Sequence, residues 1–297
     1  MKNPEIVCIL RQISQNTNVK LPESIDFEVS DGILRINLSD KGVCANMQSN
    51  ESAFEGWALC LKAWLPDLIE KVLICWNPTT HKSNLLHYER FKYRIWKFIQ
   101  TYDWAENGSL FNMDYYGENL KNWVINFPCD EADKEAQGDE AILERDYIAN
   151  QKGNYDIIDQ QLPVGVFNNV VSKASCVMPR GKSQIDIWAL RCDTLHIFEL
   201  KKSNNIMVGI ISELMYYVNI MNDIKNQRIK YPPNAKECEY RNFDILYNSL
   251  NSNKIHFIKG HFLAERLHPL ISPAVITLLN DSHIQKMENI EYSYIVL

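Results

Sequence analysis

The chain has 297 residues, of which 46% are hydrophobic and 23% are charged, and its net charge is −6. This composition is typical of a globular protein with one large domain or two ordinary ones, and the acidic balance argues against a protein that coats nucleic acid without specificity. The sequence has no run of about 18 apolar residues, no signal-peptide core after Met1 and no C-x-x-C pair among its eight cysteines, so we expect a cytoplasmic protein with reduced thiols and no membrane partner.

The first half of the chain alternates strand-like and helix-like patterns, which predicts an α/β domain. A hairpin is expected where two β-branched runs flank Asp31-Gly32, a dipeptide that favours a tight turn. The expected elements are strands at 25–29, 33–38 and 43–47, a helix at 51–64, a strand at 71–76, a helix at 84–102 and a strand at 122–127 that closes the sheet.

A polar, acidic stretch from Pro128 to Gly138 separates the two halves. This composition is typical of a linker, but the same residues could form the first turns of a helix that continues through Glu144. We therefore predict two domains, an N-terminal α/β domain over 1–130 and a second domain over 131–297.

The second half begins with an amphipathic helix pattern at 139–148 and a strand at 162–166. Two apolar runs, 185–190 and 195–200, then flank a short polar break and predict a β-hairpin. The remaining expected elements are a helix from residue 210 to at least 217, a strand at 254–263, a helix at 269–280 and a final strand at 290–297.

Each strand of the predicted hairpin carries one carboxylate, Asp186 and Glu199. If the turn pairs Arg191 with Thr194, the two carboxylates fall directly opposite each other, on one face and with Cβ atoms about 5 Å apart. Carboxylates this close repel each other unless a proton or a cation lies between them. Lys201 lies two residues beyond Glu199 and therefore on the same face. There it either completes a metal-dependent phosphoryl-transfer site or forms a salt bridge with Asp186.

The pattern Asp186…Glu199-Leu200-Lys201 resembles the PD-(D/E)xK nuclease superfamily, which includes restriction endonucleases and Holliday-junction resolvases. Ile185 stands where many members have the proline of the motif. The predicted order of helix, strand, hairpin and helix is also similar to that family. The resemblance covers roughly residues 138–222. It implies a restriction-endonuclease-like mixed sheet flanked by helices in the C-terminal half, beside a separate N-terminal α/β domain.

The resemblance implies a Mg²⁺ or Mn²⁺ ion held by Asp186, Glu199 and the backbone carbonyl of Leu200, because oxygen ligands suit these cations. Such an ion polarises a phosphate and lowers the pKa of a bound water. Lys201 would position or deprotonate that water, or neutralise charge on the phosphorus.

The helices on either side of the hairpin supply further candidate residues. The family often takes a metal-binding glutamate from the preceding helix, where Glu144 is the best match and Glu140, one turn earlier, is its competitor. After the hairpin many members carry Gln-x-x-x-Tyr, and this chain has Glu213 and Tyr217 on one helical face. The pair is expected to support binding or catalysis, or else to pack this face of the helix on the sheet.

Positive charge gathers around the candidate site. Residues 173–230 contain nine Lys or Arg and five Asp or Glu, a local balance of +4 against −10 for the rest of the chain. Phosphate contacts need a local patch of this kind. Lys182 and Lys202 are the candidate nucleic-acid-binding residues.

The sequence therefore predicts a Mg²⁺-dependent nuclease that hydrolyses phosphodiester bonds, with DNA as the expected partner. The 1–130 domain would recognise substrate, bind a partner or form a homodimer, and its sequence does not choose among these roles. The alternative is a catalytically idle restriction-endonuclease-like module that serves in binding or assembly. The Asp-Glu-Lys set favours the enzyme, and the acidic overall charge favours the idle module.

Overall fold

The computed structural model of the protein describes residues 1–79, 85–109, 112, 117–129, 138–179, 183–202 and 207–297. The chain divides into two compact units. Unit 1 consists of residues 1–113, 206–213 and 266–286, and unit 2 of residues 114–205, 214–265 and 287–297. This division differs from the expected one at residue 130, because two segments from the second half of the chain pack into unit 1. Most of the expected linker, residues 130–137, lies outside the described residues.

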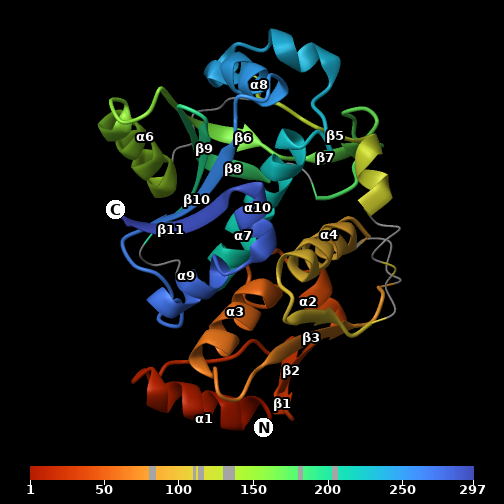
Figure 1. The fold of residues 1–297 in the computed structure, drawn as a ribbon, viewed down its shortest axis with the longest axis vertical. Helices are drawn as coiled ribbons and strands as arrows, with labels where there is room; N and C mark the ends of the chain where they lie inside the picture. The colour runs from red at the N-terminus through yellow and green to blue at the C-terminus, as the bar shows by residue number, and fades with distance from the viewer. Residues whose placement is uncertain (80–84, 110–111, 113–116, 130–137, 180–182, 203–206) are drawn as a thin grey trace. The chain divides into compact units, whose positions relative to one another are not determined.

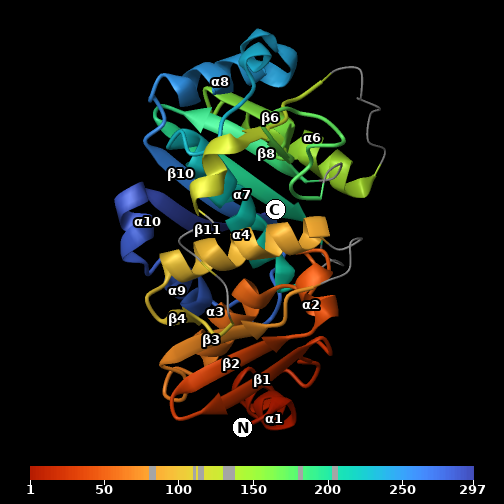
Figure 2. The same ribbon diagram turned by 90° about the vertical axis from the view of Figure 1, so that its right-hand side faces the viewer.

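Unit 1 contains a four-stranded mixed sheet in the order β1-β2-β3-β4, in which β1 and β2 are antiparallel and β3 and β4 continue the sheet in parallel (Figure 2). α3 is buried along most of its length and packs against α9, and Trp64 Nε1 donates to the carbonyl of Leu270 at 2.8 Å. The elements are α1 (Asn3–Ile13), β1 (Ile25–Ser30), β2 (Ile33–Leu38), α2 (Asp40–Cys44), α3 (Phe54–Trp64), β3 (Lys71–Trp76), α4 (Leu85–Thr101), β4 (Ala105–Asn107) and α9 (Pro273–Leu279).

The predicted N-terminal hairpin is confirmed. Asp31 and Gly32 join β1 to β2 with positive φ angles of 52° and 77°, as a tight two-residue turn requires. The strand predicted at 43–47 is wrong, because residues 40–44 form α2. Ser39 begins this helix as its N-cap, and its Oγ accepts the N–H of Gly42 at 3.3 Å.

Unit 2 contains a five-stranded sheet in the order β11-β10-β9-β8-β6 (Figure 1). β6, β8 and β9 are antiparallel neighbours, whereas β10 is parallel to both β9 and β11. The elements are η2 (Asn119–Asn122), β5 (Trp123–Ile125), α6 (Asp139–Gln151), β6 (Ile157–Pro163), β7 (Val166–Asn168), β8 (Gln184–Arg191), β9 (Thr194–Lys201), η4 (Pro233–Glu237), η5 (Tyr240–Asn242), α8 (Phe243–Asn251), β10 (Phe257–Ala264) and β11 (Ile290–Val296).

Two helices cross from one unit to the other. α7 (Gly209–Lys225) begins in unit 1 and continues in unit 2, and α10 (His283–Glu288) ends just inside unit 2. The strand predicted at 122–127 is present as β5, but it pairs with β7 in unit 2 and does not close the N-terminal sheet. None of the helices in the described part of the chain combines the length and the apolar character needed to cross a bilayer.

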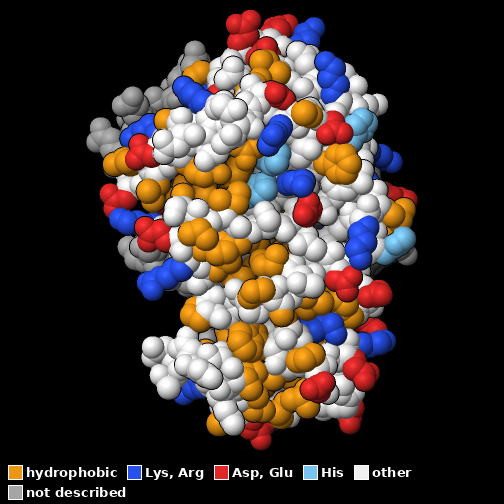
Figure 3. Space-filling view, turned by 60° about the vertical axis from the view of Figure 1, so that its left-hand side comes forward, with side chains coloured by type: hydrophobic (Ala, Val, Ile, Leu, Met, Phe, Trp, Pro, Cys, Tyr) orange, Lys and Arg blue, Asp and Glu red, His pale blue; other side chains and the backbone are white. Residues whose placement is uncertain are grey.

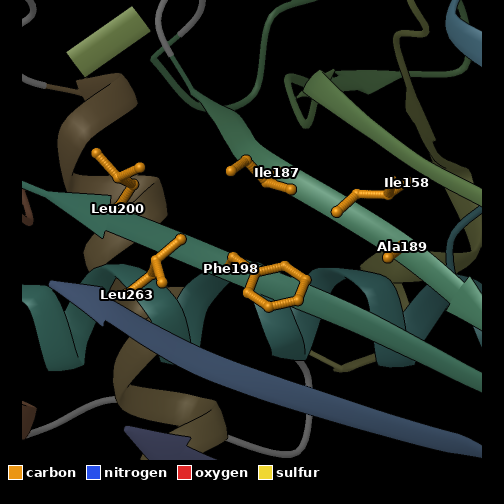
Figure 4. Packing of buried hydrophobic residues seen from close by; sticks show 6 residues of the cluster. All are labelled: Ile158, Ile187, Ala189, Phe198, Leu200 and Leu263. Carbon is orange, nitrogen blue, oxygen red and sulfur yellow. The ribbon is translucent and has the colours of Figure 1, made fainter. Parts of the chain in front are cut away.

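Helices cover both faces of the unit 2 sheet. On one face, partly buried side chains of α6 pack over an apolar cluster drawn from four strands (Figure 4): Ile158, Ile187, Ala189, Phe198, Leu200 and Leu263. α7 lies on the other face, behind the strands in Figure 4. Gly260 of β10 permits this close packing, since a Cβ there would lie 3.0 Å from Val218 Cγ2 of α7 and 2.8 Å from Tyr292 Cδ1.

Replacing Gly260 by Ala is expected to destabilise the protein by about 1–3 kcal/mol, because the added methyl group must displace its neighbours in a packed core. Differential scanning calorimetry should show a lower Tm, by roughly 2–4 °C for each kcal/mol. Gly153→Ala is the matched control, since a Cβ there meets no atom within 4 Å. Equal melting temperatures for the two variants would contradict the close approach of α7.

Candidate active site

The hairpin of β8 and β9 has the register that the sequence predicts. Arg191 pairs with Thr194, and the printed pairing continues to Ile187 and Phe198. Cys192 enters the two-residue turn with a positive φ of 55°. The ladder ends at that pair, and extending its register by one step would set Asp186 opposite Glu199.

Glu199 is buried at the carboxyl end of β9, with 1% of its surface exposed. Its Oε1 forms an ion pair with the ammonium group of Lys201, two residues later on the same strand. Because a buried carboxylate is costly unless it is paired, this contact accounts for a charge inside an otherwise apolar strand. Glu199 and Lys201 therefore lie together, as the spacing predicts.

Asp186 lies against the main chain of β9. Its Oδ2 accepts the backbone N–H of Leu200 at 2.9 Å, next to Glu199 in sequence. The Leu200 side chain points away, into the apolar cluster under α6. The hairpin thus gathers the Asp186 carboxylate, the Glu199 carboxylate and the Lys201 ammonium around one stretch of β9.

Glu144 is the one buried residue of α6, with 5% of its surface exposed, whereas Glu140 is exposed. Gln161 Nε2 donates to Glu144 Oε2 at 2.7 Å. Burial raises the pKa of the Glu144 carboxyl, and the charge of Glu140 adds to this effect. The Gln161 hydrogen bond and the charges of Arg241 and Lys201 act in the opposite direction, so Glu144 interacts electrostatically with the lysine of the hairpin.

Glu213 and Tyr217 are both buried on α7, but they belong to different units. In unit 1, Gln48 Nε2 donates to Glu213 Oε1, and Ser212 Oγ donates to Glu55 at 2.7 Å. Tyr217 lies in the part of α7 that belongs to unit 2, and its ring centroid lies 5.7 Å from that of Tyr216. The two residues remain candidates for a supporting role.

The structure describes one of the two lysines that are predicted to bind nucleic acid. Lys202 forms an ion pair with Asp139 at the start of α6, and this contact lowers the pKa of the Asp139 carboxyl. Lys182 lies outside the described residues. A surface pair such as Lys202 with Asp139 can exchange for a phosphate contact at low cost, since water screens it.

Gln161 and Arg241 lie near the site, but the sequence does not predict a role for either. Gln161 on β6 has a positive φ of 56°, and Arg241 Nη1 donates to the carbonyls of Gln160 and Gln161, both at 3.2 Å. The only sequence signal is the polar triplet at 159–161, which interrupts the alternation expected of a half-buried strand. Nothing local marks Arg241, which follows Gln161 by 80 residues.

The donor atoms fit a hard cation by their chemistry. Asp186 and Glu199 offer carboxylate oxygens from neighbouring strands, and Mg²⁺ is usually bound through one or two carboxylates with water or phosphate completing its octahedron. Among the described residues, no group of three or more His, Cys, Asp or Glu side chains is arranged to hold a metal ion. The residues present therefore fit a two-carboxylate site and not a cage built from the protein alone.

A histidine pair lies on the other side of the sheet from Glu199, as the alternation of β9 predicts for His196. His196 Nδ1 lies 2.9 Å from His261 Nε2, and His261 Nδ1 lies 2.7 Å from Ser293 Oγ. Burial lowers the pKa of His196 to about 4 and that of His261 to about 3, so both rings are neutral at pH 7. Lys259 adds to both shifts and disfavours a cation here. Figure 3 shows histidines beside Lys or Arg and hydrophobic side chains at the surface.

Comparison of the chain with known protein families, with curated proteins and with solved structures finds no match. The chemistry of the site is therefore inferred from the positions and contacts of its own residues.

The Glu144→Gln variant is expected to have a higher Tm than the wild type at pH 7 in the presence of EDTA. The raised pKa means that the folded protein holds a proton more tightly than the unfolded chain does. Stability therefore falls as pH rises from the ordinary glutamate value through the raised one, and it stays lower above that window. Glutamine keeps an acceptor for Gln161 but carries no charge.

Thermal unfolding between pH 4 and pH 8 tests this expectation. The gain in Tm should shrink towards pH 4, below the ordinary pKa of a glutamate carboxyl, because the charge that the substitution removes is then largely absent. The control is Glu140→Gln, which changes an exposed side chain one turn away. A gain of the same size at every pH would show that the effect does not come from the charge of Glu144.

Proposed function

We propose that unit 2 is a Mg²⁺-dependent nuclease domain that hydrolyses phosphodiester bonds, with DNA as its substrate. The observation that carries the proposal is the cluster on β9. Asp186 accepts the backbone N–H of Leu200, and Glu199 forms an ion pair with Lys201, so both carboxylates and the lysine adjoin the same stretch of β9, which supports an acid-acid-lysine site. The order α6, β6, β8–β9 hairpin and α7 agrees with the order of elements that the resemblance implies and supports a restriction-endonuclease-like fold.

The side chains have separable roles in this proposal. Asp186, Glu199 and the carbonyl of Leu200 would hold the ion as a two-carboxylate site, and Glu144 would add its charge from α6 without ligating the ion. A bound Mg²⁺ supplies charge that polarises the phosphate and lowers the pKa of a water. Lys201 keeps a positive charge beside Glu199, where it can orient the attacking water or offset the negative charge that grows on the phosphoryl oxygens. Hydrolysis joins the oxygen of water to phosphorus and breaks one P–O ester bond.

A catalytically idle module is the second candidate. The acidic overall charge of −6 favours it, as does the use of Lys202 in an ion pair with Asp139. Such a module would keep the hairpin for its contribution to the core and would need no metal. The two candidates differ in Mn²⁺ binding, which the nuclease requires.

The central test is cleavage of labelled DNA and RNA by the full chain, with Mg²⁺, with Mn²⁺ and with EDTA. The wild type is expected to cleave DNA only when a metal is present. Asp186→Asn, Glu199→Gln and Lys201→Met should each lower the rate by about 100-fold or more, because each removes a charge that acts on the metal or on the transition state.

Asp193→Asn is the matched control, because it removes a carboxylate from the same hairpin at its turn, away from the site. It should cleave at the wild-type rate. Residual cleavage by Asp186→Asn at the wild-type rate, with the same metal dependence, would contradict the assigned site. A wild type that neither cleaves any substrate nor binds Mn²⁺ in a calorimetric titration would favour the idle module.

A further inference from the structure

β6 is kinked at the position that faces the candidate site. The ladder between β6 and β8 pairs Gln160 with Ile187 and Leu162 with Ile185, and it skips Gln161. In this register Gln161 stands opposite Asp186. Gln161 also has the left-handed backbone, with a φ of 56°, which is uncommon for a residue other than glycine. We call this feature the Gln161 kink.

Arg241 holds the kink from outside the sheet. In a regular strand, successive carbonyls point to opposite edges. Arg241 Nη1 nevertheless lies 3.2 Å from the carbonyl oxygens of both Gln160 and Gln161. Two neighbouring carbonyls can meet one donor because the left-handed backbone turns one of them round. A regular β6 would lose one of these two hydrogen bonds.

The segment that carries Arg241 is itself fixed to β6. Arg241 and Asn242 have positive φ angles of 56° and 53°. Asn242 Nδ2 donates to Asp159 Oδ2 at 2.8 Å, which is a second contact between η5 and β6. The turn of η5 and the kink of β6 therefore support each other.

The kink also sets the direction of the Gln161 side chain. In a regular ladder this side chain would share the face of Asp186, whereas α6 covers the other face. In the kinked strand, Gln161 Nε2 reaches across to α6 and donates to Glu144 at 2.7 Å. The main chain of Gln161 thus stands opposite Asp186, and the side chain of Gln161 contacts Glu144.

We propose that Gln161 and Arg241 are positioning residues of the candidate active site: Arg241 fixes the Gln161 kink, and the kinked Gln161 holds the Glu144 carboxylate in place for the site that Asp186, Glu199 and Lys201 form. The catalytic part of this inference rests on the proposed nuclease function. Left-handed backbone at a residue other than glycine persists only where its surroundings impose it, and it concentrates at functional sites. Neither residue would contact the substrate in this role.

The test is a double-mutant cycle between Gln161 and Glu144 in the full chain. Gln161→Gly removes the amide but keeps a residue that adopts positive φ without strain. With an active wild type, this variant should lower kcat about 10-fold and weaken Mn²⁺ binding about 10-fold, the size of effect typical of groups that position the surroundings of a bound metal. The KM for DNA should change by less than twofold, because the substrate contacts remain.

The cycle separates positioning from a general loss of stability. In the Glu144→Gln background, Gln161→Gly should have no further effect on kcat, since the amide acts through Glu144. A structural role would lower kcat equally in both backgrounds and would overturn the proposal. Gln160→Ala is the matched control, because it removes the neighbouring side chain but keeps the carbonyl that Arg241 contacts.

Arg241 is tested by two substitutions. Arg241→Met removes the donor and should reproduce the Gln161→Gly defect in kcat and Mn²⁺ binding. If this variant does not fold, Arg241→Lys retains one donor and should show a smaller defect in the same two quantities. Wild-type values for Arg241→Lys and Gln161→Gly in an active enzyme would overturn the positioning roles alone. Absence of cleavage and of Mn²⁺ binding in the wild type would instead remove the proposed function, and the positioning roles with it.

Discussion

The register between β8 and β9 is the constraint on which unit 2 depends. Side chains alternate between the two faces of a strand, so a slip of one residue would move Glu199 into the apolar cluster and Phe198 to the other face. The observed register places Phe198 and Leu200 under α6, and Glu199 and Lys201 on the opposite face. β10 pairs in parallel with β9, so the placement of β10 depends on the same register.

Burial of charge is the main cost of this arrangement, and the protein offsets it locally. Glu199 pairs with Lys201, and Glu144 accepts from Gln161 near the charges of Arg241 and Lys201. Removing one partner from such a set leaves an uncompensated buried charge, which is more costly than replacing both partners by apolar residues of similar volume.

The crossover from β9 to β10 explains why the chain does not divide at one point. α7 belongs to this crossover, and its first turn is built into unit 1, where Val208 N–H donates to Asn50 Oδ1 at 3.0 Å. Gly209 allows the approach, because a Cβ there would lie 1.9 Å from the carbonyl oxygen of Gln48. A linear boundary near residue 130 cannot describe units that share a helix.

The sequence by itself determined the features that depend on neighbours along the chain. The alternation of apolar residues and the two-residue turns placed both hairpins, and the register of β8 and β9 followed from counting outward from the turn. The tertiary structure alone decided the partner of β5, the burial of Glu144 in preference to Glu140, and the Gln161 kink. Each of these depends on residues distant in sequence, as Arg241 is from Gln161. Periodicity records which face of an element is apolar, but not which distant group will meet it.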